Sequence, residues 1–204
     1  MEQYQKSVDP VAYLTSVDPV LATVINILPR PKWQKRQDYF RALVEQIVNQ
    51  QLSEKAADTI FARFLNIFHD KKIVPEIILK IDDDQIRKAG ISYAKISYIK
   101  NLAQKTINKQ LQFERIHDFT DAQVTQQLIE VKGIGVWTAE MFLIFTLARE
   151  DVFSYGDLGL RNAMKKLYKF RKHPTPKQAD KISAKWKPYR SWACRYLWAS
   201  LDIK

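Results

Sequence analysis

The sequence predicts an all-α fold, and three observations support that class. Apolar residues recur at helical spacing in one segment after another. No run of strand length alternates between apolar and polar residues. None of the eight prolines lies between residues 76 and 173, which fits a long helical middle because proline breaks helix interiors. The 204-residue chain shows no internal repeat and no low-complexity segment.

The first predicted helices are amphipathic. Apolar side chains follow the i, i+3, i+4, i+7 spacing over residues 40–51 and again over 57–68, so each segment predicts a helix with one buried face. Residues 82–89 predict a short helix that Gly90 ends, and the apolar positions of 99–107 mark the next helix.

The second half of the chain continues this pattern. Thr120 and Gln123 have the spacing of a capping box ahead of the next helix. Residues 138–148 are apolar nearly all round and predict a central buried helix. Apolar spacing predicts two further helices, over 160–168 and 189–201.

The net charge is concentrated at one end of the chain. With 33 Lys and Arg against 22 Asp and Glu, the formal charge is +11, yet residues 1–160 hold 20 basic and 20 acidic side chains. The whole excess therefore lies in residues 161–204. One-sided charge indicates a polyanionic partner, most commonly a nucleic acid. The alternative is a solvated helix face that keeps the protein soluble.

Several classes of protein are excluded by what the sequence lacks. No apolar run reaches the roughly 18 residues that cross a bilayer, and the N-terminus lacks the pattern of a signal peptide. We therefore expect no membrane partner and an intracellular protein of the cytoplasm or nucleoid, or of a eukaryotic nucleus. The single cysteine, Cys194, excludes an intramolecular disulfide, a cysteine-held zinc site and an iron–sulfur cluster. Because His69, His117 and His173 have no metal-ligand spacing, we expect no metal site and no cofactor.

Two glycines mark a sharp turn between two helical segments. Residues 128–138 read LIEVKGIGVWT, with the expected turn at Lys132, Gly133, Ile134 and Gly135. Such glycines let the backbone expose successive N–H groups at the positive end of the following helix, where they can hold a phosphate oxygen. This contact binds DNA of any sequence. Ile134 would join the two helices, and the alternative is an αα-hairpin without a ligand.

A carboxylate stands at the start of the helix predicted over 160–168. Asp157 follows Gly156 and precedes the periodic residues, which is the position of an N-cap that accepts a hydrogen bond from a helix N–H. A carboxylate fixed in this way is also held rigidly enough for chemistry. The residues alone leave both roles open.

These features together resemble a known family. The hairpin, the buried helix and the loop with Gly156 and Asp157 resemble the helix-hairpin-helix GPD superfamily of base-excision DNA glycosylases. The resemblance is closer to its 3-methyladenine DNA glycosylase II branch, which acts on alkylated bases, and it runs over about residues 17–203. Lys132 stands where the family most often has proline. Three further stretches support that branch: IVNQQLS (47–53), RKAGISYAK (87–95) and WKPYRSWA (186–193).

The resemblance implies a base-flipping enzyme with two helical subdomains around a cleft. In such enzymes a damaged nucleotide rotates out of the duplex and its N-glycosidic bond is hydrolysed. Asp157 matches the essential aspartate, which stabilises the oxocarbenium-like sugar and orients or deprotonates the attacking water. The expected subdomains are residues 1–33 with 158–204, and residues 34–157, with the cleft near Asp157 and Trp137.

The resemblance also assigns a base pocket. Trp137 stands where bifunctional relatives carry a lysine that forms a Schiff base, so a monofunctional enzyme is expected. Trp137 and Trp198 match aromatic pocket positions, where an indole face attracts the positive charge of a methylated purine. Met141 stands where a relative has tyrosine, which makes the pocket less aromatic. Without the resemblance, each tryptophan is equally an ordinary core residue.

The expected DNA contacts follow from the same match. Gln51 matches the wedge residue that fills the gap left by the flipped base. The expected partner is double-stranded DNA with alkylated bases, bound by a monomer. The hairpin residues expected to bind DNA are Lys132, Gly133, Ile134, Gly135 and Thr138. The main-chain carbonyls that could hold a structural cation, as in some family hairpins, are those of Ile129, Val131 and Ile134.

Two other functions stay open. A helix-hairpin-helix protein that binds DNA without breaking a bond would keep Gly133 and Gly135 but would not need Asp157 or the two pocket tryptophans. A glycosylase for mismatched or oxidised bases is the second alternative. The absent iron–sulfur cysteines and the absent lysine argue against it.

Overall fold

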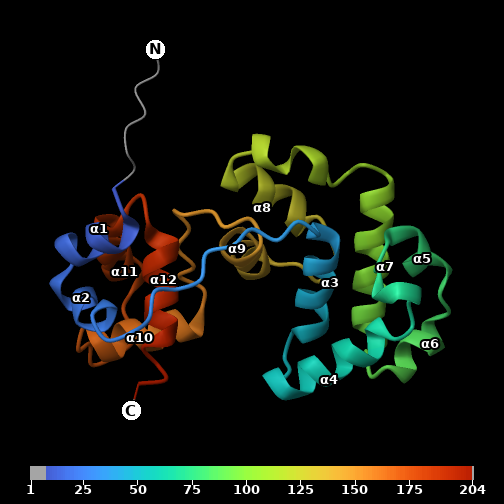
Figure 1. The fold of residues 1–204 in the computed structure, drawn as a ribbon, viewed down its shortest axis with the longest axis horizontal. Helices are drawn as coiled ribbons and strands as arrows, with labels where there is room; N and C mark the ends of the chain where they lie inside the picture. Colours follow the sequence, from blue (N-terminus) through green and yellow to red (C-terminus); the bar gives the residue numbers. More distant parts are fainter. Residues whose placement is uncertain (1–7, 204) are drawn as a thin grey trace. The chain divides into compact units, whose positions relative to one another are not determined.

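The computed structural model describes residues 8–203, and all regular structure in that range is helical (Figure 1). The predicted all-α class is confirmed. The expectation about a signal peptide falls mainly on residues 1–7, which lie outside the described range. None of the described helices has the length and apolar character needed to span a bilayer. The α-helices are α1 (Pro10–Val17), α2 (Pro19–Ile25), α3 (Tyr39–Asn49), α4 (Glu54–Leu65), α5 (Pro75–Lys80), α6 (Asp83–Lys88), α7 (Tyr93–Ile107), α8 (Asp121–Ile129), α9 (Val136–Phe145), α10 (Leu158–Leu167), α11 (Pro176–Ser183) and α12 (Arg190–Ala199), and the 3₁₀ turns are η1 (His69–Lys71), η2 (Phe113–Asp118) and η3 (Ala184–Trp186).

Local sequence explains where many of these helices begin. A side-chain oxygen at the N-cap accepts a hydrogen bond from a backbone N–H that the first turn leaves unpaired. The predicted capping box is confirmed: Gln123 N donates to Thr120 Oγ1 (3.3 Å), and Thr120 N donates to Gln123 Oε1 (2.9 Å). The other residues that cap a helix through a side-chain oxygen are Asp9, Asp18, Asp38, Asp82, Ser92, Asp157 and Thr175.

Four helices, α1, α2, α5 and α11, are missing from the sequence-based expectation, and each of them begins with proline. The expectation treated proline only as a helix breaker. At the first helical position, however, the fixed φ of proline fits the helix and its missing N–H is not needed. An Asp or Thr cap directly before proline is the signal that identifies three of these starts. The prolines concerned are Pro10, Pro19, Pro75 and Pro176.

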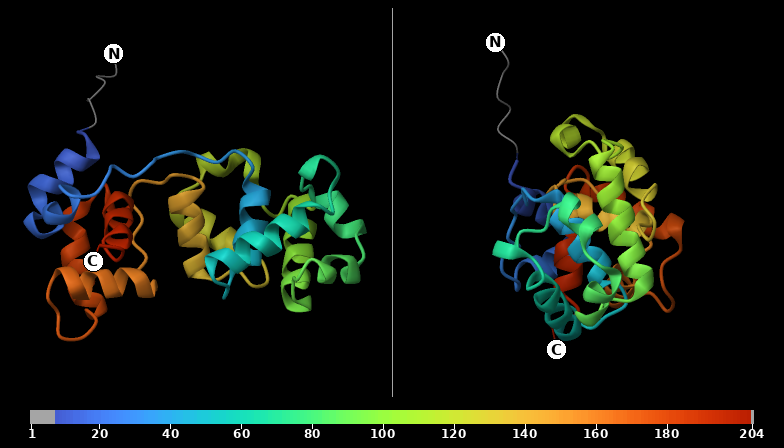
Figure 2. Two further views of the ribbon diagram at one scale, coloured as in Figure 1. Left: turned by 60° about the horizontal axis from the view of Figure 1, so that its bottom comes forward. Right: turned by 90° about the vertical axis from the view of Figure 1, so that its right-hand side faces the viewer.

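The chain forms two compact units. The first consists of the described residues of Met1–Gln34 and Ala148–Lys204, so it holds α1 and α2 together with α10, α11 and α12. In this unit, helices from the two ends of the chain lie side by side, with α2 and α12 in contact (Figure 2). The second unit, Lys35–Leu147, holds α3 to α9.

Residues 148–157 belong to the first unit, whereas the sequence analysis placed them with residues 34–157. An ion pair between Arg190 of α12 and Asp151 holds the segment there. Arg190 Nε donates to Asp151 Oδ1 (2.6 Å), and its Nη2 donates to Asp151 Oδ2 (3.1 Å). The two partners lie 39 residues apart, so helical periodicity gives no sign of this pairing.

The chain's one cysteine is buried against the same segment. Cys194 of α12 is 0% exposed, and its Sγ lies 3.7 Å from the carbonyl oxygen of Val152. The backbone N–H of Val152 donates to Ser191 Oγ (2.9 Å), which is also on α12. The segment that leads toward Asp157 is therefore tied to α12 along several residues.

A buried carboxylate ties other parts of the first unit together. Asp18 is 2% exposed and caps α2, with Oδ1 accepting from Val20 N (3.1 Å) and Leu21 N (3.0 Å). Its Oδ2 accepts from the Tyr168 hydroxyl (2.7 Å) and from Trp186 Nε1 (2.9 Å). Burial, and then the hydrogen bond to Asp18, raise the pKa of Tyr168 well above its usual range. The start of α2 is thus bonded to the end of α10 and to η3.

In the second unit, α9 is the helix that the sequence predicted as central and buried. It packs against α3 and α8. Its first turn is more exposed than expected, because Val136 is 55% and Trp137 46% exposed. The middle of the helix is buried as predicted, through Thr138, Ala139, Met141, Phe142, Leu143 and Ile144. One end of α9 therefore belongs to the surface, where it meets the hairpin.

Candidate active site and nucleic-acid interface

The predicted hairpin joins α8 to α9, with a longer connection than expected. The connection covers residues 130–135 and not only the four residues of the expected turn. The N–H of Val131 donates to the Leu128 carbonyl (3.0 Å), an i to i−3 bond that tightens and ends the helix early. Ile134 is 5% exposed, and its packing between the two helices stays a prediction.

Two features favour glycine at position 133. Its φ is +79°, in the left-handed region, and a Cβ would lie 2.1 Å from Cδ2 of Tyr98 in α7. The carbonyl of Gly133 accepts from Gln50 Nε2 (2.9 Å), just after α3. The neighbouring N–H of Lys132 donates to Asn101 Oδ1 of α7 (2.9 Å). The turn is therefore held in place from α7 and from the end of α3.

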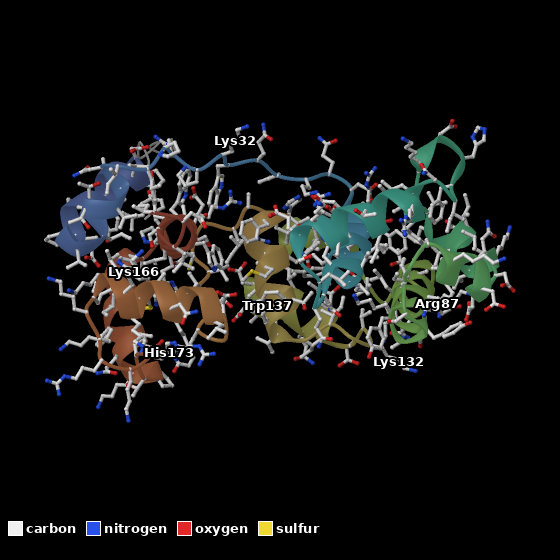
Figure 3. The ribbon with its side chains drawn as sticks, turned by 90° about the horizontal axis from the view of Figure 1, so that it is seen from below. Lys32, Arg87, Lys132, Trp137, Lys166 and His173 are labelled. Atoms are coloured by element: carbon white, nitrogen blue, oxygen red, sulfur yellow. The ribbon has the colours of Figure 1, made fainter. Side chains whose placement is uncertain are left out.

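Gly135, in contrast, faces open space. A Cβ there would meet no atom within 4 Å, and its φ of −98° is available to any residue. Gly135 is the N-cap of α9, and as a glycine it makes no side-chain cap hydrogen bond. Because the N–H groups of a helix's first turn lie at the positive end of the helix dipole, the position suits an anion such as a phosphate oxygen. The exposed side chain of Lys132 adds a positive charge on the same turn (Figure 3).

A pocket of about 650 Å³ opens beside the hairpin, within the second unit. Trp137, Met141 and Phe145, one turn apart along α9, form an apolar wall, while α3 and the residues after it supply mostly polar side chains. This volume is in the range of small-molecule sites. The residues that line it are Arg36, Glu45, Gln46, Asn49, Gln50, Gln51, Leu52, Gly133, Trp137, Thr138, Met141 and Phe145.

The pocket brings together five residues that the sequence analysis singled out: Gln51, Gly133, Trp137, Thr138 and Met141. Trp137 projects from the first turn of α9 (Figure 3), whereas Thr138 is 5% exposed. The polar side of the pocket was not expected. Within the described residues, the buried Gln46 Oε1 and Asn49 Oδ1 have no hydrogen-bond partner. Since buried polar atoms are normally paired, this face of α3 favours a ligand with hydrogen-bond donors.

Gln51 lies in a turn of residues 49–52 between α3 and α4, which we call the Gln51 turn. The backbone of Gln51 is strained. Its φ is +57°, and the left-handed region costs a non-glycine residue about 1–2 kcal/mol. Beside it, Lys95 of α7 donates from Nζ to the carbonyls of Val48 (2.8 Å) and Gln50 (2.7 Å). Burial lowers the pKa of Lys95. The turn that presents Gln51 is therefore held by a lysine from another helix.

The sequence analysis assigned no role to the contacts made by α7. Lys95, Tyr98 and Asn101 recur every three residues, so they share one face of the helix. The only signal was the RKAGISYAK stretch, which supported the resemblance without indicating partners. Lys95 bonds to a carbonyl 47 residues away and Asn101 to an N–H 31 residues away, and helical spacing carries no such information.

The predicted aspartate and a predicted pocket tryptophan form a pair in the first unit. Asp157 Oδ1 accepts from Leu160 N (2.7 Å), which is the expected cap of α10, and also from Trp198 Nε1 (2.9 Å). Two N–H donors on one oxygen fix the orientation of the carboxylate. Gly159 allows this approach, because a Cβ there would lie 3.0 Å from Asp157 Oδ1 and 3.2 Å from Trp198 Cδ1.

The predicted site residues thus gather in two places. The hairpin and its pocket lie in the second unit, and the Asp157–Trp198 pair lies in the first. The first unit also carries the basic segment, with Lys165 and Lys166 in the last turn of α10. Among the described residues, no three His, Cys, Asp or Glu side chains are grouped so that they could hold a metal ion.

A family model decides the assignment. Residues 44–188 match the model of the HhH-GPD superfamily base excision DNA repair protein. The chain belongs to this superfamily. The matched range contains the hairpin, the pocket residues from Glu45 onward and Asp157. The family expected from the sequence motifs is confirmed.

Known relatives and solved structures agree with this assignment. The chain is 35% identical to DNA-3-methyladenine glycosylase 1 of Schizosaccharomyces pombe over 180 residues, which cover 87% of this chain and 78% of that protein. The structure of the Schizosaccharomyces pombe 3-methyladenine DNA glycosylase in complex with abasic DNA matches with a TM-score of 0.86 at 31% identity, over 96% of this chain and 98% of that chain. The DNA-3-methyladenine glycosidase of Bacillus halodurans matches with a TM-score of 0.84 at 33% identity, over 97% and 91% of the two chains.

Proposed function

We propose that this protein is a monofunctional DNA glycosylase that removes alkylated purines from double-stranded DNA by hydrolysing the N-glycosidic bond. The observation that carries the proposal is the Asp157–Trp198 pair at the start of α10, in a chain of this superfamily. The names of the Schizosaccharomyces pombe and Bacillus halodurans relatives, both 3-methyladenine enzymes, support the alkylated-base class. The reaction belongs to base-excision repair.

Asp157 is the proposed catalytic carboxylate. As the base leaves, positive charge builds on the sugar, and a nearby carboxylate stabilises that charge. The N–H groups of Leu160 and Trp198 hold the Asp157 carboxylate in one orientation. Its negative charge can therefore stabilise the cationic sugar without a prior rearrangement of the side chain. The same carboxylate orients the attacking water. Trp198 is thereby proposed to position Asp157.

The pocket beside the hairpin is proposed to receive the damaged base. Methylation at N3 or N7 makes a purine cationic, and the face of an indole such as Trp137 attracts a cation by about 0.5–2 kcal/mol. Met141 and Phe145 continue the apolar wall. Trp137 offers no amine that could attack the sugar, so the products are a released base and an abasic site in an intact strand.

The DNA backbone is proposed to bind to the hairpin and to the basic segment 161–204. The hairpin contributes the N-terminal end of α9 and the Lys132 ammonium, which are proposed to contact phosphates and carry no base information. Gln51 is proposed to fill the gap left in the duplex.

The protein would act as a monomer in the compartment that holds chromosomal DNA. A structural cation on the carbonyls of Ile129, Val131 and Ile134 remains a prediction.

The test is to incubate the protein with double-stranded DNA methylated by dimethyl sulfate and to identify the released bases by mass spectrometry. Methylated purines are expected in solution, with the strand intact until alkali is added. Unmethylated DNA of the same sequence is the control. DNA binding without base release would support a non-enzymatic helix-hairpin-helix protein, and a protein–DNA adduct trapped by borohydride would contradict the monofunctional assignment.

A further inference from the structure

One face of α7 contacts both the hairpin and the Gln51 turn. Tyr98 packs where a side chain at Gly133 would lie, and Lys95 Nζ holds the carbonyl of Gln50 (2.7 Å). Gln50 joins the two regions, because its side-chain amide donates to the Gly133 carbonyl (2.9 Å). Gln50 is therefore bonded to Lys95 through its main-chain carbonyl and to the hairpin through its side-chain amide.

The carbonyls at the end of α3 accept hydrogen bonds from a cation on another helix. The last carbonyls of an α-helix have no partner within the helix and lie at its negative end. Lys95 Nζ binds two of them, those of Val48 and Gln50, on either side of Asn49. Leu52 N then donates to the Asn49 carbonyl (3.2 Å) and closes the turn around Gln51 in its left-handed conformation.

We propose that Lys95 is a positioning residue that links the DNA-binding hairpin to the Gln51 turn through Gln50. The inference rests on the proposed function, because it takes the hairpin as the phosphate site and Gln51 as the residue that fills the duplex. Lys95 touches no reacting atom. It fixes the position of Gln51 before the damaged base leaves the DNA duplex. The phosphate contact at the hairpin and the opening of the duplex at Gln51 then occur in one fixed geometry.

This role differs from simple helix capping in what it predicts. A cap that only stabilised α3 would affect every substrate equally once the protein is folded. A residue that prepares the Gln51 turn matters where a base must be pulled out of a duplex. It matters little where the base is already unstacked, since unstacking a base costs a few kcal/mol in a duplex and least in a single strand.

The experiment compares four variants on two forms of one substrate. An oligonucleotide methylated by dimethyl sulfate is used alone or annealed to its complement, and 3-methyladenine release is measured in single turnover. Lys95→Met removes the ammonium, and Gln50→Met removes the amide that reaches the hairpin. Lys100→Met is the matched control, because Lys100 is also on α7 and also binds a main-chain carbonyl, that of Ile81 (3.0 Å), as well as the Asp83 carboxylate.

Lys95→Met and Gln50→Met are expected to lower release from the duplex by about ten-fold or more, the effect of losing a hydrogen bond to a charged or buried group. Release from the single strand by Lys95→Met should change by less than about three-fold, and Lys95→Arg should recover part of the duplex rate because it keeps N–H donors. Lys100→Met should leave both rates unchanged. If Lys95→Met fails to fold, the more conservative Lys95→Arg is compared with wild type on the two substrate forms in its place.

Equal losses on the duplex and the single strand in the Lys95 variants, or a duplex loss in Lys100→Met as large as in Lys95→Met, would overturn the inference. Wild-type protein that releases no methylated base from either form would instead overturn the proposed function, before any variant is considered. The two failures are therefore distinguishable.

Discussion

Asp157 combines a structural role and a proposed catalytic role in one carboxylate. Its Oδ1 caps α10 through Leu160 N and accepts from the Trp198 indole. Capping needs only an oxygen acceptor, and asparagine supplies one about as well as aspartate. Stabilising a cationic sugar needs the negative charge. The two roles can therefore be separated by a single substitution.

Asp157→Asn is expected to abolish base release while the melting temperature and the affinity for undamaged DNA stay close to wild type. The amide keeps the cap but removes the charge that the reaction needs. Single-turnover base release, thermal unfolding and fluorescence anisotropy with unmethylated DNA measure the three quantities. Near-normal release by the folded variant would leave Asp157 with its capping role alone.

Trp198→Phe tests the other side of the pair. The change keeps an aromatic ring against Gly159 but removes the N–H that Asp157 accepts (2.9 Å). We expect kcat to fall by about ten-fold or more, in line with 1.5–3 kcal/mol for a hydrogen bond to a charged group, with little change in KM.

The control for Trp198→Phe is Trp192→Phe, on the same helix. Trp192 Nε1 also donates to a carboxylate, Glu150 Oε1 (3.2 Å), but not to Asp157. Similar losses of kcat in both variants would show that the indole at position 198 acts only through the stability of α12.

At the scale of the hairpin, its two glycines lie in different surroundings. Gly133 has a positive φ and lies against Tyr98, whereas Gly135 has an ordinary φ and faces open space. We expect Gly133→Ala to lower both the melting temperature and DNA affinity, because the turn itself must shift. Gly135→Ala should keep the melting temperature but weaken DNA binding, because the new methyl group lies where a phosphate would approach.

Thermal unfolding and DNA titration of the two glycine variants check this division. The loss of affinity should be the same for damaged and undamaged DNA, since a backbone contact carries no base information. A Gly135→Ala protein with wild-type affinity would place the phosphate site elsewhere than at the start of α9.

Helices and caps are the parts of this fold that the sequence predicts well, because they depend on residues within one or two turns of one another. The Thr120–Gln123 capping box and the Asp157 cap are examples. Starts with proline at the first position were missed, although the Asp or Thr cap before the proline is equally local. That failure came from reading proline only as a breaker.

Long-range pairs are the parts that the sequence does not reveal. Trp198 reaches Asp157 across 41 residues, and Gln50 reaches Gly133 across 83. Periodicity places each partner on a helix face, but only packing of the helices decides which faces meet. The motif resemblance identified Asp157 and Trp198 separately, and the structure shows the hydrogen bond between them.

At the scale of the whole molecule, the separation of charge predicts how binding depends on salt. The excess of +11 lies in residues 161–204. If about five or six phosphates are neutralised, log affinity should fall against log salt concentration with a slope of about −5, using about −0.9 per phosphate. Titrations at several salt concentrations measure the slope, and a slope close to zero would contradict an electrostatic interface.

Substitutions at two pairs of exposed basic residues test where that DNA interface lies. Replacing Arg171 and Lys172 by glutamine should make the slope shallower by about 0.9 for each phosphate that the variant no longer neutralises. Replacing Lys71 and Lys72, an equally exposed adjacent pair in the charge-balanced part of the chain, should leave it unchanged. The opposite result would place the phosphate-binding residues outside the basic segment.

Because Cys194 is buried, the rate at which its thiol is labelled measures how often the first unit opens. A thiol reagent reaches this side chain only when the unit opens, because Cys194 is 0% exposed, and no other cysteine competes for the reagent. The labelling rate, divided by the rate of a fully accessible thiol, gives the fraction of molecules in which the unit is open. A ligand that binds only the closed unit lowers that fraction. Slower labelling in the presence of DNA would therefore measure, in the unmutated protein, how strongly the unit that carries Asp157 takes part in binding.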